Sequence, residues 1–210
     1  MNVLIGMECS DVISNQFRLR GHSVVSCDLK PSANRAASHL QMDIFAALDR
    51  LGSWPELAVF HPVCRYLSVS GYHRVYTEPG RAKLVEAAVS DFLRFTRTSI
   101  SKVCIENPIG IMSSRWRRPD QIIQPHQFGD DASKATCLWL FGLPPLLNFN
   151  LGFPPRVVEW DGAKRFRWRN QTDSGQNRLG PTPDPETRRA ERAVSYVGIA
   201  SAMAAQWGVI

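Results

Sequence analysis

Short apolar runs alternate with amphipathic stretches along most of the chain, and their order predicts an α/β fold. Runs rich in β-branched side chains predict buried strands at Asn2–Gly6, His22–Asp28, Leu57–Phe60, Lys102–Ile105 and Thr136–Phe141. Apolar residues at helical spacing predict helices between these runs, at Val12–Arg20, Phe45–Leu51 and Gly80–Thr98. Strands and helices in this alternation build a mostly parallel sheet covered by helices on both faces.

The later part of the chain has a different pattern. The stretch from Gly142 to Thr182 is rich in Gly, Pro and Asn and lacks periodicity, which predicts an irregular lobe. Two helices are expected after it, at Pro185–Ala193 and Ile199–Trp207. We therefore divide the chain into a core (1–147), a small lobe (148–182) and C-terminal helices that pack back on the core (183–210).

Composition narrows the class of protein. Hydrophobic residues make up 44% and charged residues 21%, as in ordinary globular domains. No apolar run approaches the ~20 residues of a membrane helix, and the start lacks a secretory pattern, so we expect a cytoplasmic protein without a membrane partner. The five cysteines are scattered singly, which indicates neither a disulfide framework nor a Cys-rich zinc site. His61 and Cys64 are spaced as metal ligands can be, but no second pair completes a site, so no metal is expected.

The charge indicates an anionic partner. The formal net charge is +6, and basic residues gather at 115–118 and at 164–169, the second group among Trp160, Phe166 and Trp168. Basic residues interleaved with aromatic ones suit phosphate contacts and base stacking, which favours nucleic acid. An equally good interpretation is a solvated surface hairpin that its Trp residues anchor to the core.

Carboxylates follow the early strands, where ligands bind in parallel sheets. Asp28 ends the second strand, where a carboxylate can accept the ribose hydroxyls of a nucleotide cofactor, and Asp43 in the next turn can reach the adenine. The alternative role for Asp28 is a turn or helix cap. The turn after the first strand holds a single glycine, Gly6, which counts against NAD and ATP but not against S-adenosylmethionine, because that cofactor has no phosphate.

A cysteine and a glutamate follow the third and fourth of the parallel strands. Cys64 falls in a loop beside Arg65, and exposure next to positive charge lowers a thiol pKa and makes a nucleophile. Glu106 comes directly after the predicted strand at Lys102–Ile105, so the two side chains should face each other across adjacent strand ends. On its own, Glu106 could equally be a solvated loop carboxylate. Cys27, Cys104 and Cys137 lie inside predicted strands and are expected to be buried.

Several segments together resemble DNA cytosine-5 methyltransferases, most closely short phage-borne proteins described as cytosine methyltransferase-like. The segment around Cys64 (HPVCRYLS) resembles the family's Pro-Cys motif, and Ile105–Pro108 (IENP) is similar to its Glu-Asn-Val motif. Gln127–Gly129 followed by Ser133–Thr136 occupies the place of an aromatic-Gly turn before the family's Q-x-R-x-R strand. Tyr196–Ala200 resembles the final cofactor-side motif.

The resemblance implies a Rossmann-like class I methyltransferase sheet and a stepwise reaction on a cytosine flipped out of DNA. The Cys64 thiolate would add to C6, Glu106 would hold the N3 and amino edge, and C5 would take a methyl group from S-adenosylmethionine. Lys134 stands near the place of the family's arginines, with Arg178 as a further candidate. The cofactor would lie against residues from several strand ends: Gly6, Glu8, Cys9, Asp28, Asp43, His61, Pro62 and Ala200.

Three features depart from the family and leave other functions open, and one of them is that Lys134 and Thr136 stand in place of the arginines of its Q-x-R-x-R strand. The family's F-x-G-x-G turn is replaced by Cys9-Ser10-Asp11, and the recognition region shrinks to about Phe149–Gly180, so relaxed sequence specificity is expected. One alternative enzyme alkylates another pyrimidine or a free nucleotide. A different class of function is a catalytically lapsed Rossmann module that binds nucleic acid.

Overall fold

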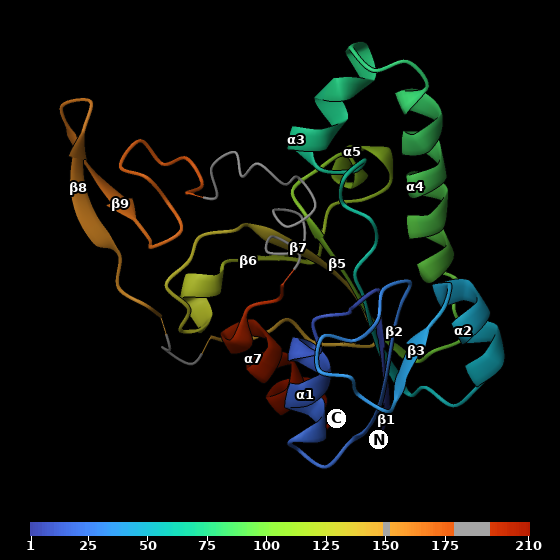
Figure 1. Cartoon of the computed structure of the whole chain (residues 1–210). Coiled ribbons are helices and arrows are strands. Elements are labelled where there is room, and N and C mark those ends of the chain that lie inside the picture. Colours follow the sequence, from blue (N-terminus) through green and yellow to red (C-terminus); the bar gives the residue numbers. More distant parts are fainter. Residues whose placement is uncertain (149–151, 179–193) are drawn as a thin grey trace.

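The computed structural model describes residues 1–148, 152–178 and 194–210, so the predicted helix Pro185–Ala193 lies outside it. Within this part the main sheet has seven strands in the order β3-β2-β1-β4-β5-β7-β6 (Figure 1). The strands are β1 (Asn2–Gly6), β2 (Ser23–Asp28), β3 (His39–Gln41), β4 (Leu57–Phe60), β5 (Lys102–Pro108), β6 (Gln121–Ile123) and β7 (Thr136–Phe141). The predicted α/β class is therefore confirmed.

The sheet is parallel from β3 to β5, and β7 joins it antiparallel to β5. Chain order reverses between β1 and its neighbour β4, because β2 and β3 lie on one side of β1 while β4 and β5 lie on the other. In such sheets the ligand site is beyond the carboxyl ends of the strands that flank this reversal. The turn after β1 and the loop after β4 therefore border the expected site.

Helices cover both faces of the sheet. On one face α1 (Val12–Arg18) packs against α7 (Val197–Trp207), and on the other α2 (Ile44–Leu51) and α4 (Arg81–Phe95) cover the strands (Figure 1). Val3 and Ile5 of β1 join the first core cluster and Leu4 joins the second, as the alternation of a strand requires. Burial on both faces explains why these strands are apolar throughout.

Several short elements escaped the periodicity analysis because each is too short to show a period. They are α3 (Val69–Tyr72), η1 (His73–Tyr76), α5 (Met112–Arg115), β6 and η2 (Pro125–Phe128). The prediction that β5 ends at Ile105 was wrong, because the strand runs on to Pro108. Beyond Ile105 it pairs with β7 alone, since the register with β4 ends at Phe60 and Ile105. Glu106 is therefore a strand residue whose backbone pairs with β7 on one side but not with β4 on the other.

The expected irregular lobe contains an antiparallel hairpin, so that prediction was wrong for this stretch. Strands β8 (Arg156–Trp160) and β9 (Ala163–Arg167) pair across a turn at Asp161 and Gly162, both with positive φ. Asp-Gly is the preferred pair for a type I′ turn because two consecutive residues must adopt left-handed backbone. The hairpin projects away from the helices of the core (Figure 1). No described helix is long and apolar enough to cross a membrane.

Candidate active site

The loop after β4 presents Cys64 to solvent at the carboxyl edge of the sheet. Cys64 is exposed, whereas Cys27, Cys104 and Cys137 are buried in strands as predicted. Two contacts fasten the start of this loop: the His61 amide donates to the carbonyl of Gly6 at 3.1 Å, and the Asn107 side chain donates to the carbonyl of Pro62 at 2.8 Å. The nucleophile predicted from sequence is thus held between β1 and β5.

The end of the same loop runs along the segment that follows β5. The Ile111 amide donates to the carbonyl of Leu67 at 2.9 Å, and a β-bridge joins Ser68 to Gly110. A Cβ at Gly110 would collide with the carbonyl of Leu67, so this close approach requires glycine. The Cys64 loop is therefore tied at its start to β5, the strand that carries Glu106, and at its end to the segment that follows β5.

Glu106 is paired with a histidine, which the sequence analysis did not foresee. His61 Nδ1 lies 3.0 Å from Glu106 Oε2, and the two side chains are only 15% and 19% exposed. Burial raises the pKa of Glu106, but the hydrogen bond from His61 and the positive charges of His61 and Lys134 oppose it, and the net pKa is lowered. Glu106 is therefore an ionised, oriented carboxylate rather than the solvated loop residue of the alternative interpretation.

Lys134 lies near this pair, at the start of the stretch leading into β7. Its positive charge acts on Glu106, and its ammonium lies 5.8 Å from the centre of the Tyr196 ring. The neighbouring backbone is fixed, because the Lys134 amide donates to Gln124 Oε1 at 2.8 Å and Asn170 bonds both backbone groups of Ser133. The fold thus gathers His61, Glu106 and Lys134 from three separate parts of the chain.

Arg178 is placed differently. Its side chain is exposed, and its Nε donates to the carbonyl of Gln171 at 2.7 Å, within its own lobe. The Arg178 amide also donates to the carbonyl of Asn170 at 2.8 Å, again within the lobe. Asn170 links the lobe to the core instead, and sequence reasoning missed it because the link spans 37 positions.

Asp28 and Asp43 each serve a local structural purpose as caps. Asp28 Oδ1 accepts the Lys30 amide at 2.8 Å, so the turn-cap role weighed for Asp28 is present. Asp43 caps α2, its Oδ1 accepting the amides of Phe45 and Ala46 at 2.9 and 3.2 Å. In both residues the described hydrogen bonds engage only Oδ1.

The turn after β1 is held by Glu8. Its carboxylate is 4% exposed and accepts hydrogen bonds from the amides of Ile13 and Ser14 and from the hydroxyls of Ser10 and Ser14, at 2.6–3.2 Å. These contacts hold the first turn of α1, where a carboxylate satisfies unpaired backbone donors. The described contacts of Glu8 are thus with the helix.

Of the remaining residues predicted to contact the cofactor, Gly6 and Ala200 pack in the core, whereas Cys9 is partly exposed at the turn after β1. Gly6 packs so closely on Phe60 and Ile44 that a Cβ would overlap their side chains, and Ala200 is fully buried between α7 and the sheet. Cys9 is half-buried; burial raises the pKa of its thiol, and so does the charge of Asp28. The β1 turn and the end of β2 therefore lie close together, and the Met7 amide donates to the carbonyl of Cys27 at 2.6 Å.

A metal centre is not supported by the described side chains, among which no three His, Cys, Asp or Glu residues group as ligands. His61, the one histidine with ligand spacing to Cys64, has its Nδ1 on Glu106.

Comparison with known proteins finds solved structures that align with part of this chain at low identity. No protein-family model and no curated protein matches the sequence. A structure described as a DNA modification methyltransferase encoded within a prophage (E. coli) aligns at TM-score 0.45 and 12% identity over 67% of this chain. The S. pombe Dnmt2 methyltransferase aligns at 0.44 and 17% over 69%, and WbdD bound to the kinase inhibitor LY294002 at 0.35 and 13% over 91%. The chain covers 46%, 51% and 47% of those chains, about half of each.

Proposed function

We propose that this protein is an S-adenosylmethionine-dependent methyltransferase that acts on C5 of cytosine in DNA. The observation that carries the proposal is the placement of Cys64, an exposed thiol in a loop fastened to the strand of Glu106. Addition of a thiolate to C6 of a pyrimidine makes C5 nucleophilic, and a carboxylate at the N3 and amino edge holds cytosine for that addition. Lys134 lies near Glu106 and supplies a donor for the base carbonyl.

S-adenosylmethionine would supply the methyl group from the neighbouring strand ends. Asp28 would accept the ribose hydroxyls and Asp43 the adenine amino group, each through Oδ2, which the hydrogen bonds among the described residues do not engage. Gly6, Cys9 and Pro62 would line the space between them, while Glu8 and Ala200 would support it from behind.

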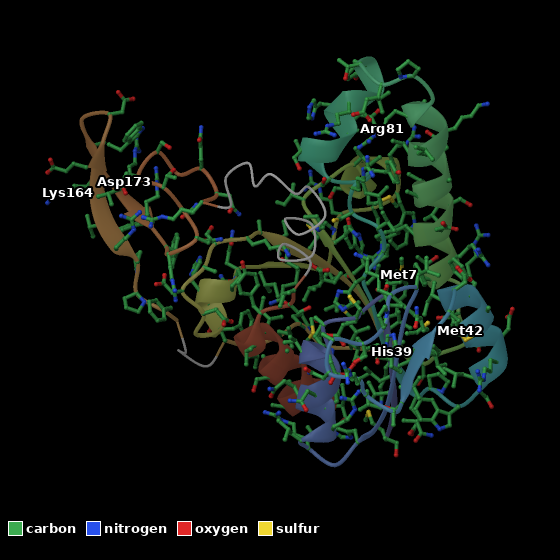
Figure 2. The ribbon with its side chains drawn as sticks, viewed as in Figure 1. Met7, His39, Met42, Arg81, Lys164 and Asp173 are labelled. Carbon is green, nitrogen blue, oxygen red and sulfur yellow. The ribbon has the colours of Figure 1, made fainter. Side chains whose placement is uncertain are left out.

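DNA is the proposed polymer, and the β8–β9 hairpin is the proposed surface for its backbone. The strand register places Arg156, Val158, Trp160, Ala163, Arg165 and Arg167 on one face of the hairpin. Arg156 pairs with Asp173, and Arg167 donates to the carbonyls of Asp173 and Phe166. Trp160 and Arg165 therefore remain for a base and a phosphate. Lys164 stands on the opposite face, at the outer edge of the hairpin (Figure 2).

The other basic cluster is largely consumed by internal ion pairs. Arg115 pairs with Glu86, and Arg117 forms a two-pronged pair with Asp120 at 2.8 and 2.9 Å. This leaves fewer phosphate contacts than the charge count alone suggests. A short recognition surface of this kind fits discrimination of one or two bases around the target.

The test is covalent trapping. DNA that contains 5-fluorocytosine should form a stable adduct with the protein in the presence of S-adenosylmethionine, because fluorine cannot leave C5 as a proton does. Cys64→Ala should form no adduct, whereas Cys104→Ala, which changes a buried thiol of β5, should still form it. Trapping by Cys64→Ala, or by a fluorinated nucleotide in preference to DNA, would reject the proposal as stated, the second result in favour of an enzyme of free nucleotides.

A further inference from the structure

The pairing of His61 with Glu106 raises a question of proton supply. His61 Nδ1 lies on the carboxylate, while its Nε2 is buried and has no hydrogen-bond partner among the described residues. A buried imidazole with one nitrogen on a carboxylate and the other unpaired has the geometry of a group that holds and passes a proton. A buried ring nitrogen with no hydrogen-bond partner destabilises the fold, so a purely structural role does not account for it.

The chemistry of addition demands a proton at the base. When the Cys64 thiolate forms the S–C6 bond, the C5=C6 pair shifts to C4=C5 and the C4=N3 pair takes a proton at N3. Glu106 is ionised at rest and carries no proton to give. A donor must therefore recharge it, and His61 is the titratable group hydrogen-bonded to it.

We propose that His61 is a positioning residue that orients Glu106 and supplies the proton that this carboxylate delivers to N3 of the base. The inference rests on the proposed function. The proton moves from His61 Nδ1 to Glu106, and the neutral acid then gives it to N3, so that Glu106 is again ionised and His61 neutral. When solvent water takes the C5 proton, the C–H pair forms the C5=C6 bond, the S–C6 pair leaves with the Cys64 thiolate, and the N3 proton returns to His61 through Glu106.

The other charged and titratable groups around the pair explain why a histidine is needed. Lys134 faces Glu106 from the stretch before β7 and favours its ionised form. Cys104 and Cys137 lie beside it on β5 and β7, and burial and the charge of Glu106 raise the pKa of both thiols, that of Cys137 to about 11. These thiols stay protonated near neutral pH, and Cys64 acts on the base itself. Among these groups His61 is the one hydrogen-bonded to the Glu106 carboxylate, and an imidazole is the side chain best suited to pass a proton near neutral pH.

Two substitutions separate orientation from proton supply. His61→Asn keeps an N–H donor near the position of Nδ1 but cannot titrate, and His61→Ala removes both properties. The readout is exchange of the C5 proton of cytosine in duplex DNA with deuterated solvent, measured without S-adenosylmethionine between pH 5.5 and 8.5. Exchange requires addition at C6 and proton transfer at N3, but no methyl donor.

We expect His61→Asn to slow exchange about 10²-fold, the usual contribution of a positioned acid or base, and to lose the inflection of the wild-type pH profile. Alkylation of Cys64 by iodoacetamide should proceed equally in both proteins, which a general collapse of the loop would not allow. His61→Ala should be slower still. In ¹⁵N spectra of the imidazole, Glu106→Gln should shift the titration of His61.

The outcomes separate the two proposals. Wild-type exchange rate and pH profile in His61→Asn would overturn the proton role while the methyltransferase proposal stands. A folded wild type that neither exchanges C5 protons nor traps 5-fluorocytosine DNA would reject the proposed function, and the proton role with it. An imidazole titration unchanged in Glu106→Gln would refute the pair itself.

Discussion

Arg81 offers the sharpest test of how the active-site loop is held. It lies in the first turn of α4, is 2% exposed, and stands where α4 meets the α3–η1 segment (Figure 2). Its guanidinium donates to the carbonyls of Arg65 and Gly71, each at 2.9 Å, and to Glu78 at 2.8 Å. It also lies 4.7 Å from the ring centre of Tyr66. One side chain therefore clamps both residues that follow Cys64 and the short helix beyond.

The magnitude follows from these contacts for Arg81→Met, which keeps most of the buried stem. Each charged hydrogen bond to a carbonyl contributes about 1.5–3 kcal/mol. The pair with Glu78, whose side chain is 42% exposed, adds at most about 1 kcal/mol. Met packing offsets part of this loss, so we expect the free energy of unfolding to fall by about 3–5 kcal/mol. For a chain of this size that lowers Tm by roughly 10 °C.

The assay is urea unfolding of wild type and variant, with adduct formation on 5-fluorocytosine DNA measured at a temperature where both are folded. Arg94→Met is the matched control, because Arg94 lies on the same helix but is exposed, with its guanidinium over Phe45, and should change stability by about 0.5 kcal/mol. If Arg81→Met loses less than about 1 kcal/mol, the clamp as described does not exist. If it is destabilised but traps DNA at the wild-type rate, the clamp does not position Cys64.

Two further predictions concern the loop bridge and the hairpin. Gly110→Ala should destabilise the protein by about 1–3 kcal/mol in urea unfolding, because its Cβ meets the Leu67 carbonyl, while Gly152→Ala should be neutral; equal stabilities would contradict the close approach. Arg165→Ala should reduce the slope of log K against log salt for duplex DNA by about 0.9, measured by fluorescence anisotropy. Lys164→Ala, on the other hairpin face, should leave the slope unchanged; the reverse result would place the DNA on that face.

Periodicity predicted the parts of the fold that are buried by regular elements. The central strands read as apolar runs because both faces are covered, and α4 showed its stripe through Val85, Ala88, Phe92 and Phe95, all buried. The extension of β5 could not be seen, because Glu106, Asn107 and Pro108 have the composition of a turn. In the structure these three residues continue the strand and pair with β7 alone. The Asp161-Gly162 pair indicates a hairpin turn, but the high Gly, Pro and Asn content of the surrounding stretch led to the prediction of an irregular lobe.

The sequence indicated which residues belong to the candidate site, but it did not indicate which of them contact each other. Strand-end position picked out Cys64, Glu106, His61 and Asp28, because topology fixes which edge of the sheet a strand end reaches. It could not show that His61 bonds Glu106 across 45 positions, since any strand-end polar group is compatible with several partners until the fold brings one within reach. Arg81 gave no signal at all, because a basic residue in a first helical turn is ordinarily solvated.

The carboxylates near the sheet edge differ in whether the fold occupies both of their oxygens, and this difference narrows where the proposed cofactor can bind. Glu8 uses both of its oxygens on α1 and its serines, so removing its charge should affect folding before binding. In Asp28 and Asp43 the described hydrogen bonds engage Oδ1 alone, and under the proposed function Oδ2 of each binds the cofactor. A group that caps and binds at once is oriented before the ligand arrives, which lowers the entropy lost on binding. Glu106 is oriented in advance in the same way, because its hydrogen bond with His61 is present before any base binds.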